Sequence, residues 1–444
     1  MITTKKVFHP LCCLLLFLSM NASAQELKQM TNYVDPFIGA VGEGHIFPGA
    51  SLPYGMVKLG PDCLPMNANS GYNADGLLKG FSHLHVSGTG GPPKYGNVLV
   101  AATTGAISIH DYASKRGSEK AAPGYFSVEL PRFNLFSEFT VSHSVGFHQY
   151  TAADSGNLNL LFDLGSFLSW GGYKEEGELD QELVGSEVEI LSPTEVQGYT
   201  RVRGGWNVGE AYTVYFYAVT NQPAIRSGTW KKSELHQGSA QEFDSGLPTG
   251  GYLSFRTKAG DRIKMKVGIS SISTAKAKQN VSAEIGHWDF DLVKNKAAAA
   301  WNEKLATIAV TSSNEDHKKI FYSALYRTML MPVNRSGENP KWTSSVPYYD
   351  DFYCIWDTYR ATHPLLTLIQ KQEQVAMINS LLDMYKQEGY MPDARSGNYT
   401  GRTQGGSNTD VVITDAWVKG LKGIDYNEAL KAVIKNAEVP PGGD

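Results

Sequence analysis

The feature that most constrains the fold is a change in sequence pattern near Ser273. Before this residue, short runs of β-branched and aromatic residues recur between Gly, Pro, Asn and Asp; they include 98–102, 125–130, 158–164, 212–219 and 263–269. Several runs alternate at period two, and no convincing helical pattern interrupts them. We therefore predict a large β-sandwich over residues 25–272.

After Ser273 the pattern is helical. Residues 283–308 carry apolar side chains at helical spacing, which predicts one long amphipathic helix within a linker over residues 273–310. Further helical stripes fill residues 311–444. Their expected end signals are Ser312 and Ser313, Gly389, Ser407 with Asp410, and Asp425 with Glu428. These stripes have too few partners to bury them all, so we expect an incomplete helical domain.

The N-terminus has the pattern of an export signal. Lys5 and Lys6 precede an apolar run at 11–18, and small residues at 22–24 form a cleavage site before Gln25. We therefore assign residues 1–24 to a signal peptide and expect export to the periplasm or the outside of the cell. No later segment has the roughly 18 apolar residues of a membrane-spanning helix.

The overall charge argues against one class of partner. The chain has 444 residues, a formal net charge of -4 and an isoelectric point near 6.3. Because a nucleic-acid-binding surface is normally basic, we do not expect a nucleic-acid partner. The oligomeric state is left open by the sequence.

The strongest candidate site is the stretch 348–368. It combines four tyrosines with Asp350, Asp351, Trp356, Asp357, Arg360 and His363. A folding core tolerates so many polar groups only when each finds a partner, because an unpaired buried charge costs several kcal/mol. A sugar supplies such partners, since its hydroxyls bind carboxylates and guanidinium groups while its C–H face packs on aromatic rings.

Asp357 is the acid that we single out in this stretch. It could cap a helix or pair with Arg360, which would contribute about 0.3 kcal/mol if exposed. Its neighbours Trp356 and Tyr359 favour a role in ligand binding instead, because aromatic rings beside acids mark a site. Asp410 and Asp415 are explained by helix capping and by a helix surface.

Three histidines in the N-terminal half are further candidates. His45 lies in a stretch rich in glycine and proline, which predicts a shaped loop that either presents it to a ligand or only covers the sandwich end. His83 and His85 are two residues apart on one face of a predicted strand. They suit a metal, a ligand, or internal hydrogen bonds, and the metal ligands remain unknown.

Several long motifs, in order, resemble those of glycoside hydrolase family 92, the exo-acting α-mannosidases. They are D-P-F-I-G, G-H-I-F-P-G-A-S-L-P-Y-G-M-V, G-F-S-H-L-H-V-S-G-T-G, D-F-Y-C-I-W-D-T-Y-R-A-T-H-P-L-L-T-L-I and D-V-V-I-T-D-A-W-V-K-G. The resemblance implies an N-terminal β-sandwich followed by an (α/α)6 barrel, here incomplete. It also implies Ca²⁺-dependent release of mannose from α-mannosides, with α-1,2-linked mannosides expected, by an inverting mechanism.

The resemblance also implies what this chain carries. Trp356, Asp357 and Arg360 would contact mannose, with His45, His83 and His85 on the sandwich side. The family's E-G-N-x-W motif with the general acid and its G-N-D-D-x-G motif with the base do not occur before Asp444, so no catalytic residue is expected here. The segment G-G-P-P-K-Y-G-N after His85 also lacks an acid that is common in the family.

Other interpretations remain compatible with the sequence. One is a glycan-binding protein without catalysis, which keeps the sandwich and the aromatic site. Another is an inactive fragment of a mannosidase. A structural extracellular β-sandwich module is a further one, but it leaves the cluster from Trp356 to His363 unexplained. Binding of mannose without product would favour the first, and absence of binding would favour the second.

Overall fold

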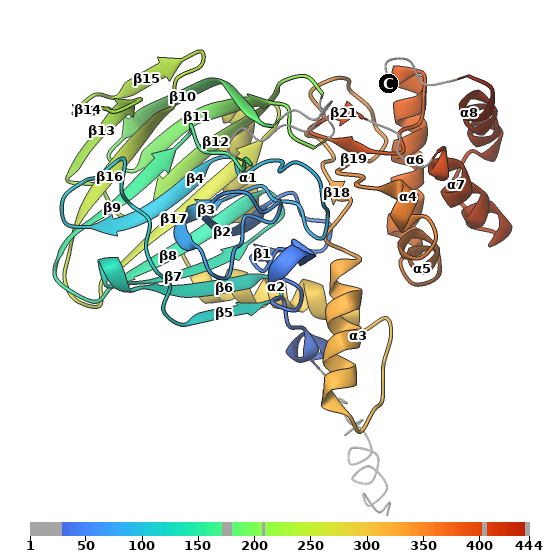
Figure 1. Ribbon diagram of the computed structural model, residues 1–444, viewed down its shortest axis with the longest axis horizontal. Coiled ribbons are helices and arrows are strands. Elements are labelled where there is room, and N and C mark those ends of the chain that lie inside the picture. The colour runs from blue at the N-terminus through green and yellow to red at the C-terminus, as the bar shows by residue number, and fades with distance from the viewer. Residues whose placement is uncertain (1–28, 171–179, 207–208, 402–405, 440–444) are drawn as a thin grey trace, which may run out of the picture.

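The protein has a β-sandwich followed by a group of helices (Figure 1). The computed structural model describes residues 29–170, 180–206, 209–401 and 406–439. The predicted signal peptide, residues 1–24, lies outside these ranges. The predicted order of a sandwich and then part of a helical domain is confirmed.

Two antiparallel sheets form the sandwich in the described ranges. The strands of the first sheet, in spatial order, are β1 (Ala50–Ser51), β2 (Lys58–Leu64), β3 (Leu77–Ser82), β4 (Leu99–Thr104), β9 (Gly156–Asp163), β16 (Thr249–Thr257), β13 (Arg226–Lys231) and β14 (Glu234–Gln237). Those of the second are β15 (Gln241–Asp244), β10 (Glu182–Ser192), β11 (Glu195–Arg203), β12 (Tyr212–Thr220), β17 (Arg262–Ser270), β8 (Val145–Ala152), β7 (Leu135–Val141), β6 (Tyr125–Leu130) and β5 (Glu119–Ala122).

Alternation along the strands creates the core between the sheets. In β11, Val196 and Val202 point inward and are buried. Between them, buried residues alternate with partly or fully exposed ones. Aromatic rings fill the space between the sheets, as in the Phe162–Phe216 stack with centroids 6.0 Å apart. All five predicted runs coincide with strands, and the run at 125–130 has the same bounds as β6.

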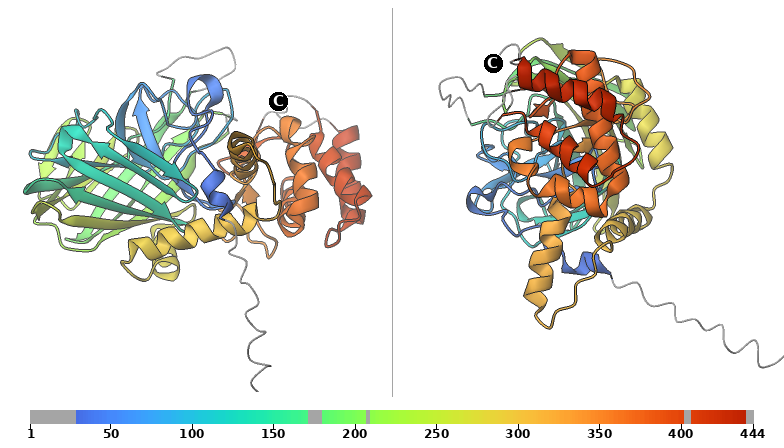
Figure 2. Two further views of the ribbon diagram at one scale, coloured as in Figure 1. Left: turned by 90° about the horizontal axis from the view of Figure 1, so that it is seen from below. Right: turned by 90° about the vertical axis from the view of Figure 1, so that its right-hand side faces the viewer.

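The predicted long helix is wrong, because the structure has two helices there. They are α1 (Thr274–Glu284) and α2 (Phe290–Leu305). The helix is interrupted between Glu284 and Phe290, and Asp289 caps the start of the second helix. Its carboxylate accepts a hydrogen bond from Leu292 N at 2.9 Å. Both helices run along the sandwich, with α1 packed on β12 and β17 and α2 on β7 (Figure 2).

The remaining helices and short strands make up the second part of the molecule. They are α3 (Glu315–Arg327), α4 (Ile355–Thr358), α5 (Thr362–Ile369), α6 (Lys371–Glu388), α7 (Asn408–Val418) and α8 (Tyr426–Glu438), with the strand pairs β18 (Val333–Asn334) with β19 (Tyr349–Asp350) and β20 (Arg395–Ser396) with β21 (Tyr399–Thr400). Short 3₁₀ turns occur at Met30–Tyr33, Gly42–Gly44 and Pro131–Phe133.

Some predicted helix ends are confirmed and others are wrong. Gly389 ends α6 in the left-handed conformation with φ +84°, and Asp425 caps α8 through Asn427 N and Glu428 N. The expected caps at Ser312 and Ser313 are wrong, since Asn314 accepts the hydrogen bonds that begin α3. Ser407 precedes α7 without a side-chain cap, because the Asp410 carboxylate binds Asn436 instead.

Part of the helical surface is apolar and exposed. Leu368 on α5, Trp417 and Val418 on α7, and Leu430 on α8 are between 59% and 71% exposed. Apolar stripes of this kind normally face another packed layer. In the described part of the chain, no helix combines the length and apolar character required to cross a membrane.

A chain of hydrogen bonds between histidines lies inside the sandwich. His83 and His148 are fully buried with their Nε2 atoms 3.0 Å apart. His83 Nδ1 donates to the carbonyl of Val98, so its Nε2 must accept from His148 Nε2, and His148 Nδ1 then accepts from the Tyr150 hydroxyl. This pattern is the one that two neutral rings form, and burial favours the neutral rings. Burial lowers the pKa of His83 to about 4 and that of His148 well below its ordinary value.

Acidification is expected to destabilise the protein through this pair. Burial disfavours the charged ring in the folded state, so the unfolded chain takes up protons first as the pH falls from about 6.5 toward 4. Between pH 7 and 5 the pair should lower the free energy of unfolding, by on the order of 2 kcal/mol from His83, measured by urea unfolding of the parent beside the variant below. His148→Gln, which donates without titrating, should flatten this dependence. An unchanged slope in the variant would contradict the assignment.

Candidate active site

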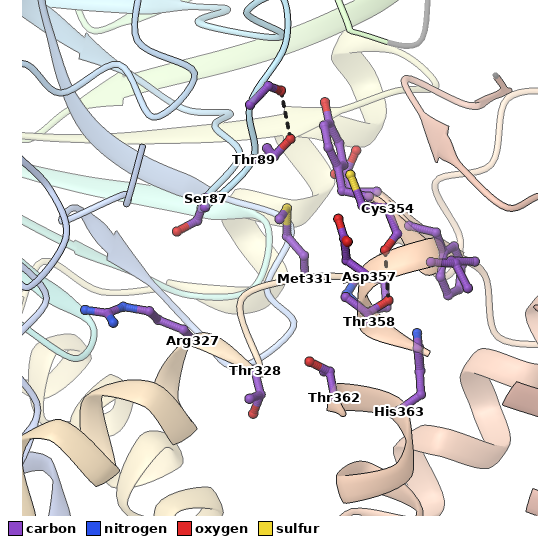
Figure 3. A pocket seen from close by; sticks show the side chains of 17 residues that line it. Ser87, Thr89, Arg327, Thr328, Met331, Cys354, Asp357, Thr358, Thr362 and His363 are labelled. Atoms are coloured by element: carbon purple, nitrogen blue, oxygen red, sulfur yellow. Dashed lines mark hydrogen bonds between the residues drawn. The ribbon is translucent and has the colours of Figure 1, made fainter. Parts of the chain in front are cut away.

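A cavity of about 220 Å³ lies where the sandwich meets the helices (Figure 3). Three segments that are distant in sequence enclose it. One is the sandwich loop 87–90, the second is the end of α3 with the turn after it, and the third runs from Asp351 to His363. The polar side chains that line it are Ser87, Thr89, Arg327, Thr328, Asp351, Tyr353, Asp357, Thr358, Thr362 and His363.

The Asp357 carboxylate is available to a ligand in this cavity. The residue is exposed, and its backbone NH donates to Cys354 O at 2.8 Å as α4 begins. No described residue forms an ion pair or hydrogen bond with its carboxylate, Arg360 included. An accessible carboxylate accepts hydrogen bonds only, which suits hydroxyl groups as ligands.

The two acids before this segment have protein partners. Asp350 and Asp351 are buried, and Arg335 reaches both, at 3.4 Å to Asp350 Oδ2 and 2.8 Å to Asp351 Oδ2. Arg395 adds a second cation 3.7 Å from Asp350 Oδ1. Burial raises the pKa of Asp351, and Arg335 opposes that rise. Ion pairing within the protein therefore accounts for these two acids without a ligand.

Trp356 and Arg360 do not line the cavity. Trp356 belongs to an aromatic group at its edge: the Trp206 ring stacks on Tyr353 with centroids 3.9 Å apart and lies 6.3 Å from that of Trp356. Arg360 is exposed and lies over the Tyr359 ring, 5.0 Å from its centroid. Trp206 reaches this group from the loop after β11 and was not among the residues singled out from the sequence.

His45 lines a second, wider cavity of about 590 Å³ on the sandwich. This cavity also has Tyr72, Asn73 and Trp170 in its wall, and Gly90 lines both cavities. Asn69 holds the shared loop from beneath: its buried amide donates to the carbonyls of residues 89, 90 and 91 at 2.8, 3.0 and 3.0 Å. The two cavities are therefore neighbours separated by a fixed loop.

His83 and His85 reach neither cavity. His85 is 2% exposed, and its Nε2 lies 2.7 Å from Asp62 Oδ1 while its Nδ1 donates to Lys58 O. His83 belongs to the buried histidine pair. Of the alternatives for these two residues, internal hydrogen bonding is the one that the structure displays.

Several lining residues were missed in the sequence. Ser87 to Gly90 end the quoted motif G-F-S-H-L-H-V-S-G-T-G, of which only His83 and His85 were singled out. Arg327, Thr328 and Thr362 lie at helix ends with no pattern of their own. Gly88 has a left-handed backbone with φ +72° in the structure, and its residue type is the local signal that could have indicated a shaped loop.

The acidic side chains of the described residues do not gather into a cluster of the kind that holds Ca²⁺. Within the ranges given above, no three His, Cys, Asp or Glu side chains come together around a point where a metal could bind. Asp393 and Asp410 are one pair of acids close enough for their charges to interact. Their oxygens already accept hydrogen bonds from Asn408 and Asn436, whereas Ca²⁺ requires six to eight oxygen ligands. No step of a reaction is therefore assigned to a metal here.

Sequence comparison matches both parts of the chain. The sequence model of the glycosyl hydrolase family 92 N-terminal domain matches residues 33–270, and that of the family 92 catalytic domain matches residues 276–444. An uncharacterised secreted glycosidase of Arthroderma benhamiae is 32% identical over 99% of this chain and 56% of its own length.

Solved structures give the same result. A family 92 α-mannosidase from Bacteroides thetaiotaomicron in complex with mannoimidazole superposes with a TM-score of 0.83 and 27% identity, over 93% of this chain and 56% of that one. A family 92 inverting mannosidase from the same organism gives a TM-score of 0.79 and 25% identity, over 91% and 55%. This chain thus spans about half the length of these relatives.

Asp410 is expected to make stability depend on pH. Burial, with repulsion from Asp393, raises the pKa of Asp410 to about 7 from an ordinary value of 3.8. The folded state then holds a proton that the unfolded chain has released, so the free energy of unfolding falls as the pH rises from about 4 to 7. Asp410→Asn should be more stable than the parent at pH 8 and similar at pH 4, by urea unfolding. Asp415→Asn on the same helix is the control, and equal behaviour of the two variants would refute the expectation.

Proposed function

Since this chain belongs to glycoside hydrolase family 92, we propose that it supplies the sugar-binding part of an exported α-mannosidase. The terminal mannose occupies the cavity between the sandwich and the helices. The observation that carries this proposal is the unpaired Asp357 carboxylate in a cavity built from both parts of the molecule. The solved relative in complex with mannoimidazole and the relative named as secreted support it.

Asp357 would accept hydrogen bonds from mannose hydroxyls in this cavity. Thr89, Thr358 and Thr362 add hydroxyl groups that both donate and accept, and Met331 contributes an apolar surface. The group of Trp206, Tyr353 and Trp356 lies at the cavity edge and offers aromatic faces to a sugar ring. Arg360 is a further proposed contact, since its exposed side chain could turn toward a bound glycan.

The second cavity would hold the rest of the glycan. It is more than twice the volume of the first, it adjoins it at Gly90, and its wall combines His45 and Trp170 with carboxamide groups. α-1,2-Linked mannosides are the expected substrates by family resemblance. His83 and His85 would act only through the packing of the sandwich beneath these cavities.

Hydrolysis with inversion requires two carboxyl groups about 6.5 to 9.5 Å apart, one to protonate the leaving oxygen and one to activate water. We assign neither role to a residue of this chain, because the corresponding family motifs do not occur in it. The role of this chain is to bind and orient the mannose. Ca²⁺ dependence of hydrolysis is part of the proposal through the family, with ligands outside the described residues.

Asp357→Asn should weaken mannose binding by about 10-fold to 100-fold. The amide keeps the size of the side chain and loses the charge that strengthens its hydrogen bonds, which are worth about 1.5 to 3 kcal/mol to a charged group. Titration calorimetry with mannose and an α-1,2-mannobiose measures this change.

The control is Asp291→Asn, an exposed acid on α2 that pairs with Lys294 away from both cavities. Equal affinity of the Asp357→Asn variant and the parent would exclude Asp357 from the site. Binding by the parent chain without mannose release would support a non-catalytic glycan-binding protein, and no binding at all would support an inactive fragment.

Removal of Ca²⁺ should separate folding from activity. EDTA is expected to leave the melting temperature of the 444-residue chain unchanged, because its described residues form no metal site. Mannose release by a chain that also carries the family's acid and base motifs should fall on EDTA treatment and return with added Ca²⁺. Mannose release that persists in EDTA would remove Ca²⁺ from the proposal.

A further inference from the structure

One tyrosine hydroxyl joins the sandwich to the cavity wall. Tyr95 lies in the loop between β3 and β4, is 1% exposed, and has a left-handed backbone with φ +71°. Its hydroxyl donates to Asp351 Oδ1 and accepts from Arg335 Nη2 and from Gly397 N, both at 3.0 Å. A phenol has one hydrogen to donate and two lone pairs to accept, so its capacity is fully used.

The three partners come from three separate segments of the helical part. Arg335 follows β18, Asp351 follows β19, and Gly397 lies in the turn between β20 and β21. Arg335 also binds Asp351 Oδ2 at 2.8 Å, which closes a ring of contacts. The Tyr95 hydroxyl is thus the point at which a sandwich loop fixes the relative positions of these segments.

The third segment of the cavity wall, which carries Asp357, begins at Asp351. From Asp351 to Asp357 nearly every residue lines the cavity, and two of them, Asp351 at φ +57° and Cys354 at φ +53°, are in the left-handed region. Such a conformation is unfavourable for residues other than glycine and persists only where the surroundings fix it. The fixed end of this segment is the carboxylate that Tyr95 and Arg335 hold.

Tyr95 itself is held firmly by the sandwich. Its backbone NH donates to Gln181 Oε1 at 3.1 Å, and its carbonyl accepts from Gln181 Nε2 at 2.9 Å. Its ring meets that of Tyr212 edge to face with centroids 5.5 Å apart. Lys94 beside it donates to the carbonyl of Gly204 at 2.7 Å. The segment that departs from the common family sequence is therefore a rigid support.

We propose that Tyr95 is a positioning residue that acts through Asp351 to set the place of Asp357 in the sugar-binding cavity. This inference rests on the proposed function of that cavity. Tyr95 does not line the cavity and contacts no sugar there; its effect passes along the strained segment between the two acids.

Tyr95→Phe tests the inference, because it keeps the ring and removes the hydroxyl. The variant should bind mannose about tenfold more weakly than the parent chain by titration calorimetry. Tyr150→Phe is the matched control, because its ring is also fully buried and its hydroxyl binds His148 inside the sandwich, away from both cavities. It should lose thermal stability to a similar degree and keep its affinity within about twofold.

A double variant separates positioning from a loss of stability. If Tyr95 acts through Asp351, then adding Tyr95→Phe to Asp351→Asn should cause little further loss of mannose affinity, whereas independent effects would multiply. If Tyr95→Phe lowers the melting temperature, the mannose affinities of this variant, of Asp351→Asn and of the double variant are all measured at a temperature below the lowest of their melting temperatures.

The outcomes are distinguishable from those of the proposed function. Absence of mannose binding by the parent chain would overturn the proposed function and this inference with it. Mannose binding by the parent with equal affinities for Tyr95→Phe and Tyr150→Phe, or with multiplying effects in the double variant, would overturn the positioning role and leave the proposed function standing.

Discussion

The structure depends on a buried group of charges at the junction of its two parts. Arg335, Arg395, Asp350 and Asp351 are at most 3% exposed and neutralise one another there. Because removal of one partner would leave a desolvated charge, the junction tolerates only one arrangement of its segments. Two apolar surfaces can shift slightly against each other at little cost. The ion pairs here are directional and share the Tyr95 hydroxyl, so they fix the segments that carry them in one relative position. The cavity inherits its shape from this constraint.

Local signals in the sequence predicted the elements well where the signal lies within one turn or strand. The alternating run at 125–130 is β6, Gly389 ends α6, and Asp425 starts α8. The errors arose where adjacent residues competed for the same role. Asn314 took the cap expected at Ser312 and Ser313, because its side chain reaches two backbone NH groups of the first turn.

Contacts between distant residues could not be predicted from one sequence. His83 meets His148 across 65 residues, and Tyr95 meets Asp351 across 256. Residue type alone marked Asp357, whose aromatic and acidic neighbours indicated a site. The same reasoning grouped Asp350 and Asp351 with it, and only the fold distinguishes acids that arginine neutralises from one that faces a cavity. The wall segment Ser87–Gly90 was not predicted, because small residues of these types occur in many loops that bind no ligand.

The exposed indole of Trp417 has a practical consequence. A tryptophan that is 62% exposed emits at long wavelength because water relaxes around its excited state, and the emission shifts to the blue when the ring is covered. The apolar face of α7 therefore carries its own optical reporter. A polypeptide or amphiphile that binds to this face and covers the ring will shift the wavelength of its emission, so binding can be followed without a label on the chain.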